Sequence, residues 1–167
     1  MKIVFDLDGV LRDLNTYLYN KYSIPYPQNW LWKHDNKDIF EWVGQDYQIL
    51  LHAPETEYCS IVRTYIDNIE IWTCQPPNWR DKTQHWINKH LGTCKVRFLS
   101  TKEKEERLDF LVDHILVEDS PNFESYSKIA LIDRPYNQHI KANHRICKPE
   151  ELKELCLMRR SEQHLKV

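Results

Sequence analysis

Residues 4–11 read Val4-Phe5-Asp6-Leu7-Asp8-Gly9-Val10-Leu11, an apolar run that leads into two aspartates and a glycine. The run Lys2–Leu7 has the length and apolar content of a strand that is buried on both faces. Sheet stability does not select two carboxylates in such a place, because charged groups are costly to bury. In a continuing strand, residues i and i+2 point the same way, so Asp6 and Asp8 are expected to face one site. Gly9 then allows a tight exit and the close approach of a ligand.

Further apolar runs follow, each with a polar residue at its end: Ile69–Thr73, Val96–Ser100, Ile115–Glu118 and Ile129–Asp133. Helix-like segments lie between and after them: Asn78–Leu91, Lys102–Val112 and a last helix that Pro149 opens. This alternation predicts an α/β fold with a Rossmann-like, three-layer parallel sheet. Ligands bind such sheets beyond the carboxyl ends of the strands. The polar residues that end the runs lie there: Asp6, Asp8, Thr73, Ser100, Glu118 and Asp119.

Residues 11–68 interrupt the alternation. They contain no convincing buried strand, and their patterns predict helices at Leu14–Tyr22, Asp38–Tyr47 and Glu55–Ile66. A segment of this length is too long for a simple crossover, so it is interpreted as a small helical cap inserted after the first strand. We therefore predict a core domain of residues 1–10 and 69–160, a cap of residues 11–68 and a disordered tail at 161–167.

The composition is that of an ordinary globular chain, with 41% hydrophobic and 29% charged residues among 167. A net charge of −2 argues against a protein that grips long nucleic acid, which needs a basic face. Five cysteines without a Cys-x-x-Cys pair are expected to be reduced thiols. No secretion-signal pattern is visible, and no apolar stretch reaches the roughly 18 residues of a membrane span. We expect a soluble, cytoplasmic protein.

A second acidic pair, Glu118-Asp119, ends another buried run at the same predicted sheet edge as Asp6 and Asp8. Carboxylates that converge there repel each other strongly unless a cation neutralises them. Oxygen-only ligands of this kind suit Mg²⁺. The sequence therefore predicts a magnesium site that involves Asp6, Asp8, Glu118 and Asp119.

Together these motifs resemble those of the haloacid dehalogenase superfamily of phosphatases over about residues 1–150. Residues 4–11 are similar to the first motif of that superfamily, Thr73 to the second and residues 116–122 to the fourth. The third motif is a lysine, for which Lys102 and Lys104 compete, and we favour Lys104. The resemblance implies a magnesium-dependent phosphomonoesterase with a cap over its active site.

The resemblance also implies a role for each residue. Asp6 attacks phosphorus and forms an aspartyl-phosphate, and Asp8 protonates the leaving oxygen and then activates the hydrolytic water. The Asp6 carboxylate, the Asp8 backbone carbonyl and Asp119 hold Mg²⁺, while Glu118 acts through a water or a neighbouring group. Thr73 and the lysine bind the phosphoryl oxygens.

A narrower resemblance, to the 5′(3′)-deoxyribonucleotidase branch, lies in Leu131–Asn137, in Val10 and in the helix after Thr73. In that branch, cap aromatics form a pocket for the base. It implies a nucleotide as the small phosphorylated substrate, with contacts from Thr73, Cys74, Trp30, Trp32, Phe40 and Trp42. Within this stretch, Arg134–Asn137 is interpreted as a structural turn, and Cys74 is also interpreted as a small filler.

Three alternatives stay open at this point. The first is a phosphatase for the 3′-phosphate ends of polynucleotides, which the near-neutral charge disfavours. The second is another small-metabolite phosphatase of the same superfamily. The third belongs to a different class, a non-catalytic protein that binds a phosphorylated ligand, which the intact Asp6 and Asp8 disfavour. The sequence does not indicate an oligomeric state.

Overall fold

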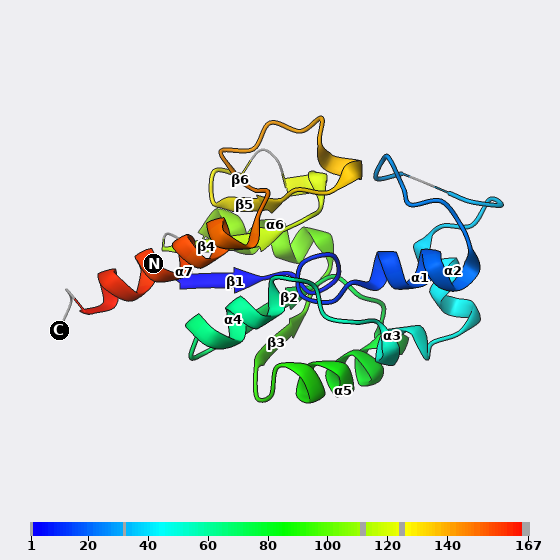
Figure 1. The fold of residues 1–167 in the computed structure, drawn as a ribbon, viewed down its shortest axis with the longest axis horizontal. Coiled ribbons are helices and arrows are strands. Elements are labelled where there is room, and N and C mark those ends of the chain that lie inside the picture. The colour runs from blue at the N-terminus through cyan, green and yellow to red at the C-terminus, as the bar shows by residue number, and fades with distance from the viewer. Residues whose placement is uncertain (1, 32, 111–112, 124–125, 165–167) are drawn as a thin grey trace.

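The computed structural model describes residues 2–31, 33–110, 113–123 and 126–164, with side chains to Met158. Within these residues, six parallel strands form one sheet in the order β3-β2-β1-β4-β5-β6 (Figure 1). Their bounds are Lys2–Phe5 (β1), Glu70–Thr73 (β2), Lys95–Phe98 (β3), His114–Glu118 (β4), Ile129–Ile132 (β5) and His144–Ile146 (β6). The predicted parallel α/β sheet is confirmed. The edge strand β6, with three mostly polar residues, was not predicted.

Helices cover both faces of the sheet. Ile3 and Phe5 of β1 point to one face, into a core shared with α4 (Cys59–Tyr65), α5 (Arg80–His90) and α7 (Pro149–His164). Val4 points to the other face, into a second core with α6 (Thr101–Phe110). This alternation is the period-2 pattern of a strand buried on both sides. The predicted three-layer arrangement is therefore present.

Short 3₁₀ turns follow the strands β2, β4 and β5. These are η1 (Pro77–Trp79), η2 (Pro121–Phe123) and η3 (Pro135–Asn137). One predicted end differs. The C-terminal helix α7 continues to His164, so it includes residues 161–164, which were predicted to be a disordered tail. The predicted helix end at Val112 lies outside the described residues. None of the described helices is both long and apolar enough to cross a membrane.

A small helical cap lies beyond the carboxyl end of β1 (Figure 1). Its helices are α1 (Leu14–Tyr22), α2 (Ile39–Gln45) and α3 (Ile49–His52), and they share a core of their own that includes Leu18, Trp42 and Leu50. Helix α4, the last helix of the predicted insertion, packs instead in the core between the sheet and α7. The cap boundary at residue 68 stays a prediction, but its own core ends near Ala53.

Charge pairing fixes the amino-terminal edge of the sheet. Glu70 is buried at the start of β2, where its carboxylate accepts hydrogen bonds from Lys2, from Arg97 (2.9 Å) and from Trp72 Nε1 (2.8 Å). Burial by itself would raise the pKa of Glu70, but these donors outweigh it and hold the pKa well below its usual range. The carboxylate therefore ties β1, β2 and β3 together at the end opposite the cap.

Candidate active site

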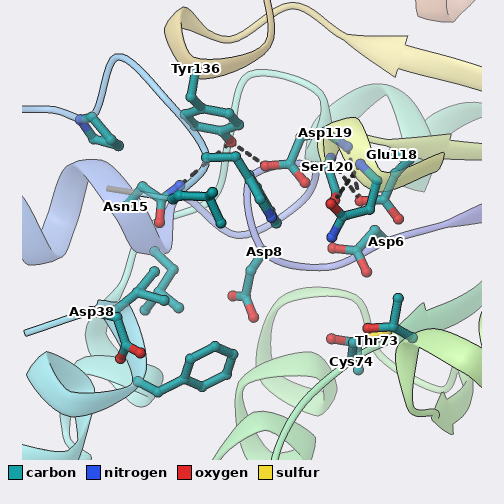
Figure 2. Close-up of a pocket in the computed structure, with 18 of the residues that line it drawn as sticks. Asp6, Asp8, Asn15, Asp38, Thr73, Cys74, Glu118, Asp119, Ser120 and Tyr136 are labelled. Carbon is teal, nitrogen blue, oxygen red and sulfur yellow. Dashed lines mark hydrogen bonds between the residues drawn. The ribbon is translucent and has the colours of Figure 1, made fainter. Parts of the chain in front are cut away.

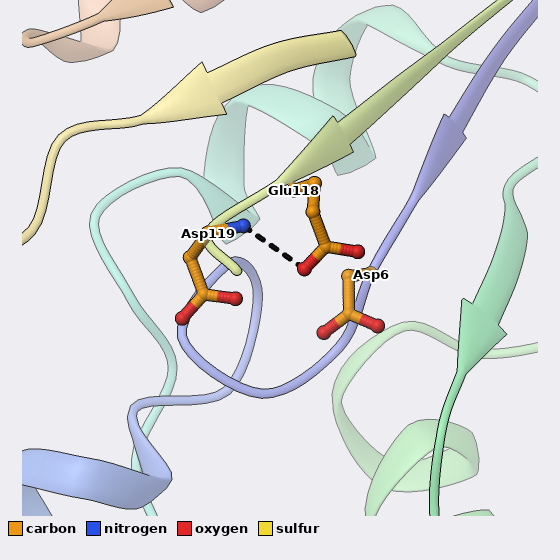
Figure 3. Close-up of side chains that lie close together, drawn as sticks. All are labelled: Asp6, Glu118 and Asp119. Carbon is orange, nitrogen blue, oxygen red and sulfur yellow. Dashed lines mark hydrogen bonds between the residues drawn. The ribbon is translucent and has the colours of Figure 1, made fainter. Parts of the chain in front are cut away.

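Three carboxylates meet at the carboxyl end of the two central strands. Strands β1 and β4 are neighbours with Phe5 opposite Val117, so the next residues, Asp6 and Glu118, emerge side by side. Oxygens of Asp6, Glu118 and Asp119 all lie within 4.8 Å of one another, and all three residues are buried (Figure 3). The sequence prediction that the two acidic motifs converge thus agrees with the geometry.

Lys104 supplies the one buried cation bonded to this group in the described part of the chain. Its Nζ lies 2.7 Å from Asp6 Oδ1 and 2.5 Å from Glu118 Oε2. Burial lowers the pKa of Lys104, but the two carboxylates more than offset this and raise it. Lys102 is exposed on the outer side of α6, where it faces Glu106 at 3.8 Å. The structure therefore brings Lys104, and not the competing Lys102, to the carboxylates, because two residues of α-helix, about 200° of rotation, turn Lys102 toward solvent.

Three carboxylates and one bonded ammonium group leave the cluster with excess negative charge when the carboxyl groups are ionised. Glu118 also accepts the backbone N–H groups of Asp119 and Ser120, each at 3.1 Å. Burial, and next the charge of Glu118, raise the pKa of Asp6 to about 8, although Lys104 opposes this. The same two causes raise the pKa of Asp119 well above its usual range. Excess negative charge on oxygen donors only is what Mg²⁺ neutralises in proteins, so this donor set fits the predicted ion.

Gly9 brings the loop after β1 close to this cluster. Its φ of +82° is in the left-handed region, and a Cβ there would lie 2.0 Å from Asp119 Oδ2 and 2.6 Å from Asp119 Cγ. Only glycine leaves room for the carboxylate. From the other side, Arg134 Nε and Nη2 donate to the Gly9 carbonyl at 3.0 and 2.7 Å. The loop is therefore held between Arg134 and Asp119.

Asp8 occupies a separate place. Strand β1 ends at Phe5, so the alternation that was expected to align Asp8 with Asp6 does not continue, and Asp8 is not among the three clustered carboxylates. Its oxygens accept hydrogen bonds from Arg12 Nε (2.6 Å) and Nη2 (3.0 Å), and from Gln75. Asp8 nevertheless lines the same cavity as Asp6 (Figure 2). Its metal contact, predicted through the backbone carbonyl, stays a prediction.

Arg12 fixes the Asp8 carboxylate through two hydrogen bonds. It is fully buried, and besides Asp8 it donates to the Leu50 carbonyl at 2.9 Å and to Thr83 Oγ1 at 3.3 Å. These partners belong to the cap helix α3 and the core helix α5, so Arg12 connects the cap to the core. A buried guanidinium with a bidentate carboxylate is a rigid arrangement.

A cavity of about 630 Å³ lies between the carboxylates and the cap (Figure 2). Its sheet end includes Thr73, Cys74 and Thr101, and its cap end includes Trp30 and Phe40. Both cap aromatics are partly exposed, at 40% and 51%. Burial raises the pKa of the Cys74 thiol to about 11, which favours the neutral thiol in this lining residue.

One predicted substrate contact, Trp42, is not among the residues that line this cavity. Trp42 is buried in the cap core, where its ring lies 4.9 Å from that of Tyr22, because it faces inward from α2. Trp32 lies outside the described residues. Of the predicted aromatic contacts, Trp30 and Phe40 line the cavity and Trp42 does not, since the sequence pattern of a short helix does not reveal which of its faces is covered. That any of them contacts a substrate stays a prediction.

Several lining or supporting residues were missed by sequence reasoning: Arg12, Asn15, Asp38, Gln75, Trp79 and Tyr136. Arg12 and Gln75 lie in loops without any periodic pattern, so no sequence signal indicated their contacts. Tyr136 did have a signal, because it belongs to Arg134–Asn137, which was interpreted as a structural turn.

Comparison with known proteins finds a solved structure with a similar fold. No protein-family model matches the sequence, and no curated protein matches it significantly. One similar solved structure is the "putative beta-phosphoglucomutase" from Thermotoga maritima, with 15% identity and a TM-score of 0.53 over 95% of this chain and 99% of that one. The two chains share a fold. That fold is the haloacid dehalogenase fold predicted from the four motifs, whereas 15% identity carries no conclusion about the substrate.

Proposed function

We propose that this protein is a magnesium-dependent phosphomonoesterase that works through an aspartyl-phosphate on Asp6, and that it acts on (deoxy)nucleoside monophosphates. The observation that carries the proposal is the position of Asp6. Its carboxylate ends the central strand, lines a cavity of about 630 Å³, and lies 2.7 Å from Lys104 and beside Asp119. This is a nucleophile with a cation and a candidate metal ligand next to it.

The first step would form a bond between an Asp6 oxygen and phosphorus while the ester P–O bond breaks. An ammonium group has three donor hydrogens, and Lys104 uses two on Asp6 and Glu118. The third is therefore available to a phosphoryl oxygen. Thr73, at the end of β2, and Thr101, at the start of α6, line the same end of the cavity and would add hydroxyl donors.

Proton transfer is assigned to Asp8. It would give a proton to the leaving oxygen in the first step and take one from the attacking water in the second, when the bond between Asp6 and phosphorus breaks. Arg12 and Gln75 hold its carboxylate at the edge of the cavity. Because these contacts fix the side chain, substrate binding need not order it.

Asp6 and Asp119 would hold Mg²⁺, together with the Asp8 backbone carbonyl. When bound, the ion supplies positive charge that stabilises the phosphoryl oxygens as negative charge develops. Glu118 is engaged by Lys104 and by two backbone N–H groups. It therefore serves to position Lys104 rather than to contact the ion directly.

The nucleoside part of the proposal rests on the aromatic end of the cavity. Trp30, Phe40 and Trp79 line it, and the rings of Phe40 and Trp79 lie 5.3 Å apart. The partly exposed rings of Trp30 and Phe40 suit a flat base, whose stacking is worth about 1–3 kcal/mol. The acidic lining, with Asp38 in the cap, favours a short neutral leaving group over a polyanionic strand.

The test is phosphate release from a panel with Mg²⁺: 5′- and 3′-mononucleotides, sugar phosphates and 3′-phosphorylated oligonucleotides. We expect mononucleotides to be hydrolysed best and Asp6→Asn to reduce release to background. If sugar phosphates or oligonucleotides are preferred, the nucleotide assignment is wrong. If no monophosphate is hydrolysed, or Asp6→Asn keeps full activity, the mechanism is wrong.

A further inference from the structure

The turn η3 touches Asp119 twice. The Tyr136 hydroxyl donates to Asp119 Oδ2 (Figure 2). Asn137 Nδ2 donates to the Asp119 carbonyl at 2.7 Å and to the Ile132 carbonyl at 2.8 Å. Both residues are almost fully buried, with exposed fractions of 1% and 0%. Two consecutive residues thus fix the side chain and the backbone of one carboxylate residue.

The ring of Tyr136 is held from the cap. It stacks on Tyr26, with centroids 6.2 Å apart and an interplanar angle of 10°, and it packs against Trp30 at 5.5 Å. Asn15 Nδ2 also approaches the Tyr136 hydroxyl oxygen at 3.5 Å. These contacts restrict the ring, so the direction in which its hydroxyl points is determined by groups on both sides of the cavity.

The neutral charge of the Tyr136 donor matters for metal binding by Asp119. A lysine or arginine in the same place would orient Asp119 but would also cancel the charge that a cation needs. A neutral phenol orients the carboxylate and leaves its charge in place. With one acceptor site of Oδ2 engaged by Tyr136, the remaining acceptor sites of the Asp119 carboxylate stay available to a cation. Such partners of metal ligands commonly change metal affinity by about 10–100-fold when they are removed.

We propose that Tyr136 is a positioning residue for the divalent cation: its hydroxyl fixes the Asp119 carboxylate in the orientation that binds metal. The proposal rests on the metal site of the proposed function. It gives the segment Arg134–Asn137 a role beyond that of a turn, since Arg134 holds the Gly9 loop while Tyr136 and Asn137 bind Asp119 on the other side of that loop.

The test is a titration with Mn²⁺, an ion with similar oxygen ligands, in which the electron paramagnetic resonance signal of the free ion reports how much is bound. Tyr136→Phe keeps the ring and its cap contacts and removes only the hydroxyl. The matched control is Tyr47→Phe, which removes a hydroxyl that accepts from Asn78 at 2.7 Å in the cap. Circular dichroism of each metal-free variant verifies folding.

We expect Tyr136→Phe to weaken Mn²⁺ binding about 10–100-fold and Tyr47→Phe to leave it unchanged. We further expect excess Mg²⁺ to restore most of the kcat of Tyr136→Phe. Unchanged affinity in Tyr136→Phe, or an equal loss in both variants, would overturn the proposal. The binding assay does not depend on hydrolysis. If the wild-type protein binds Mn²⁺ but hydrolyses no monophosphate, the proposed function is refuted and this inference is not. If the wild-type protein binds no Mn²⁺, this inference is refuted.

Discussion

Gly9 offers a direct test of the site geometry, because the chain contains a matched control. Both Gly9 and Gly92 have a positive φ, +82° and +73°. An alanine in that backbone region costs about 1–2 kcal/mol. At Gly92 nothing lies within 4 Å of the added Cβ, so Gly92→Ala shows the backbone cost by itself. For a chain of this size, that corresponds to a fall in Tm of about 2–8 °C.

Gly9→Ala adds a collision to the same backbone cost. The new Cβ would lie 2.0 Å from Asp119 Oδ2, and ordinary contact begins at 3.4 Å, so the carboxylate must move by more than 1 Å. A displacement of about 1 Å at a catalytic group can reduce the rate about 100-fold. The Tyr136 hydroxyl, 3.1 Å from the same Cβ, restricts the escape of Asp119.

The two variants are compared by thermal unfolding, by Mn²⁺ titration and by phosphate release at saturating substrate. We expect Gly9→Ala to lose more stability than Gly92→Ala, to bind Mn²⁺ weakly, and to lose at least about 100-fold in kcat. Gly92→Ala should keep wild-type metal binding and kcat. Equal effects of the two substitutions on metal binding and kcat would refute the close approach of the Gly9 loop to Asp119.

Three further predictions concern the lysines, the buried edge carboxylate and the aromatic cap. Lys104→Gln should reduce kcat by about 100-fold or more, because it removes a buried phosphate donor, whereas Lys102→Gln should stay near wild type; equal activities in a steady-state assay would contradict this. Glu70→Gln should lower the free energy of unfolding by about 1–3 kcal/mol at pH 7. Since the folded pKa of Glu70 is depressed, its contribution is present above the unfolded value of about 4.3 and is lost as the pH falls through the folded pKa. Urea unfolding should therefore show the two proteins converging at low pH, and a constant difference would refute this assignment. Trp30→Ala should raise the KM for mononucleotides about tenfold, while Trp42→Ala should instead cost about 3–5 kcal/mol of stability; a KM effect from Trp42→Ala alone would reverse the assignment of the two rings.

The strands that carry the site were predictable because buried parallel strands have a simple pattern. Runs such as residues 2–7 and 115–118 are apolar on both faces and end in acids, so both the sheet and the meeting of Asp6 with Asp119 could be inferred. The edge strand β6 could not, since His144–Ile146 is short, polar and paired on one side only, so its place depends on contacts with β5.

Side-chain contacts between distant loops were beyond the sequence. The expectation that Asp8 faces the same point as Asp6 assumed a continuing strand, but β1 ends at Phe5 and Asp8 turns to Arg12. The interpretation of Arg134–Asn137 as a turn was incomplete for a similar reason. No periodic pattern relates Tyr136 to Asp119, because their contact arises from the tertiary arrangement of two loops.

The central claim, that Asp6 becomes phosphorylated, is tested most directly by acid quench of a single turnover followed by mass spectrometry of the peptide that contains residues 4–11. With a hydrolysed mononucleotide and Mg²⁺, the account predicts a transient phosphoryl group on Asp6 that forms and decays more slowly in Asp8→Asn, because Asp8 acts in both steps, and that is absent in Asp6→Asn. Phosphate release by wild type with no phosphoryl group on Asp6 at any time point, or with one on a different residue, would contradict it.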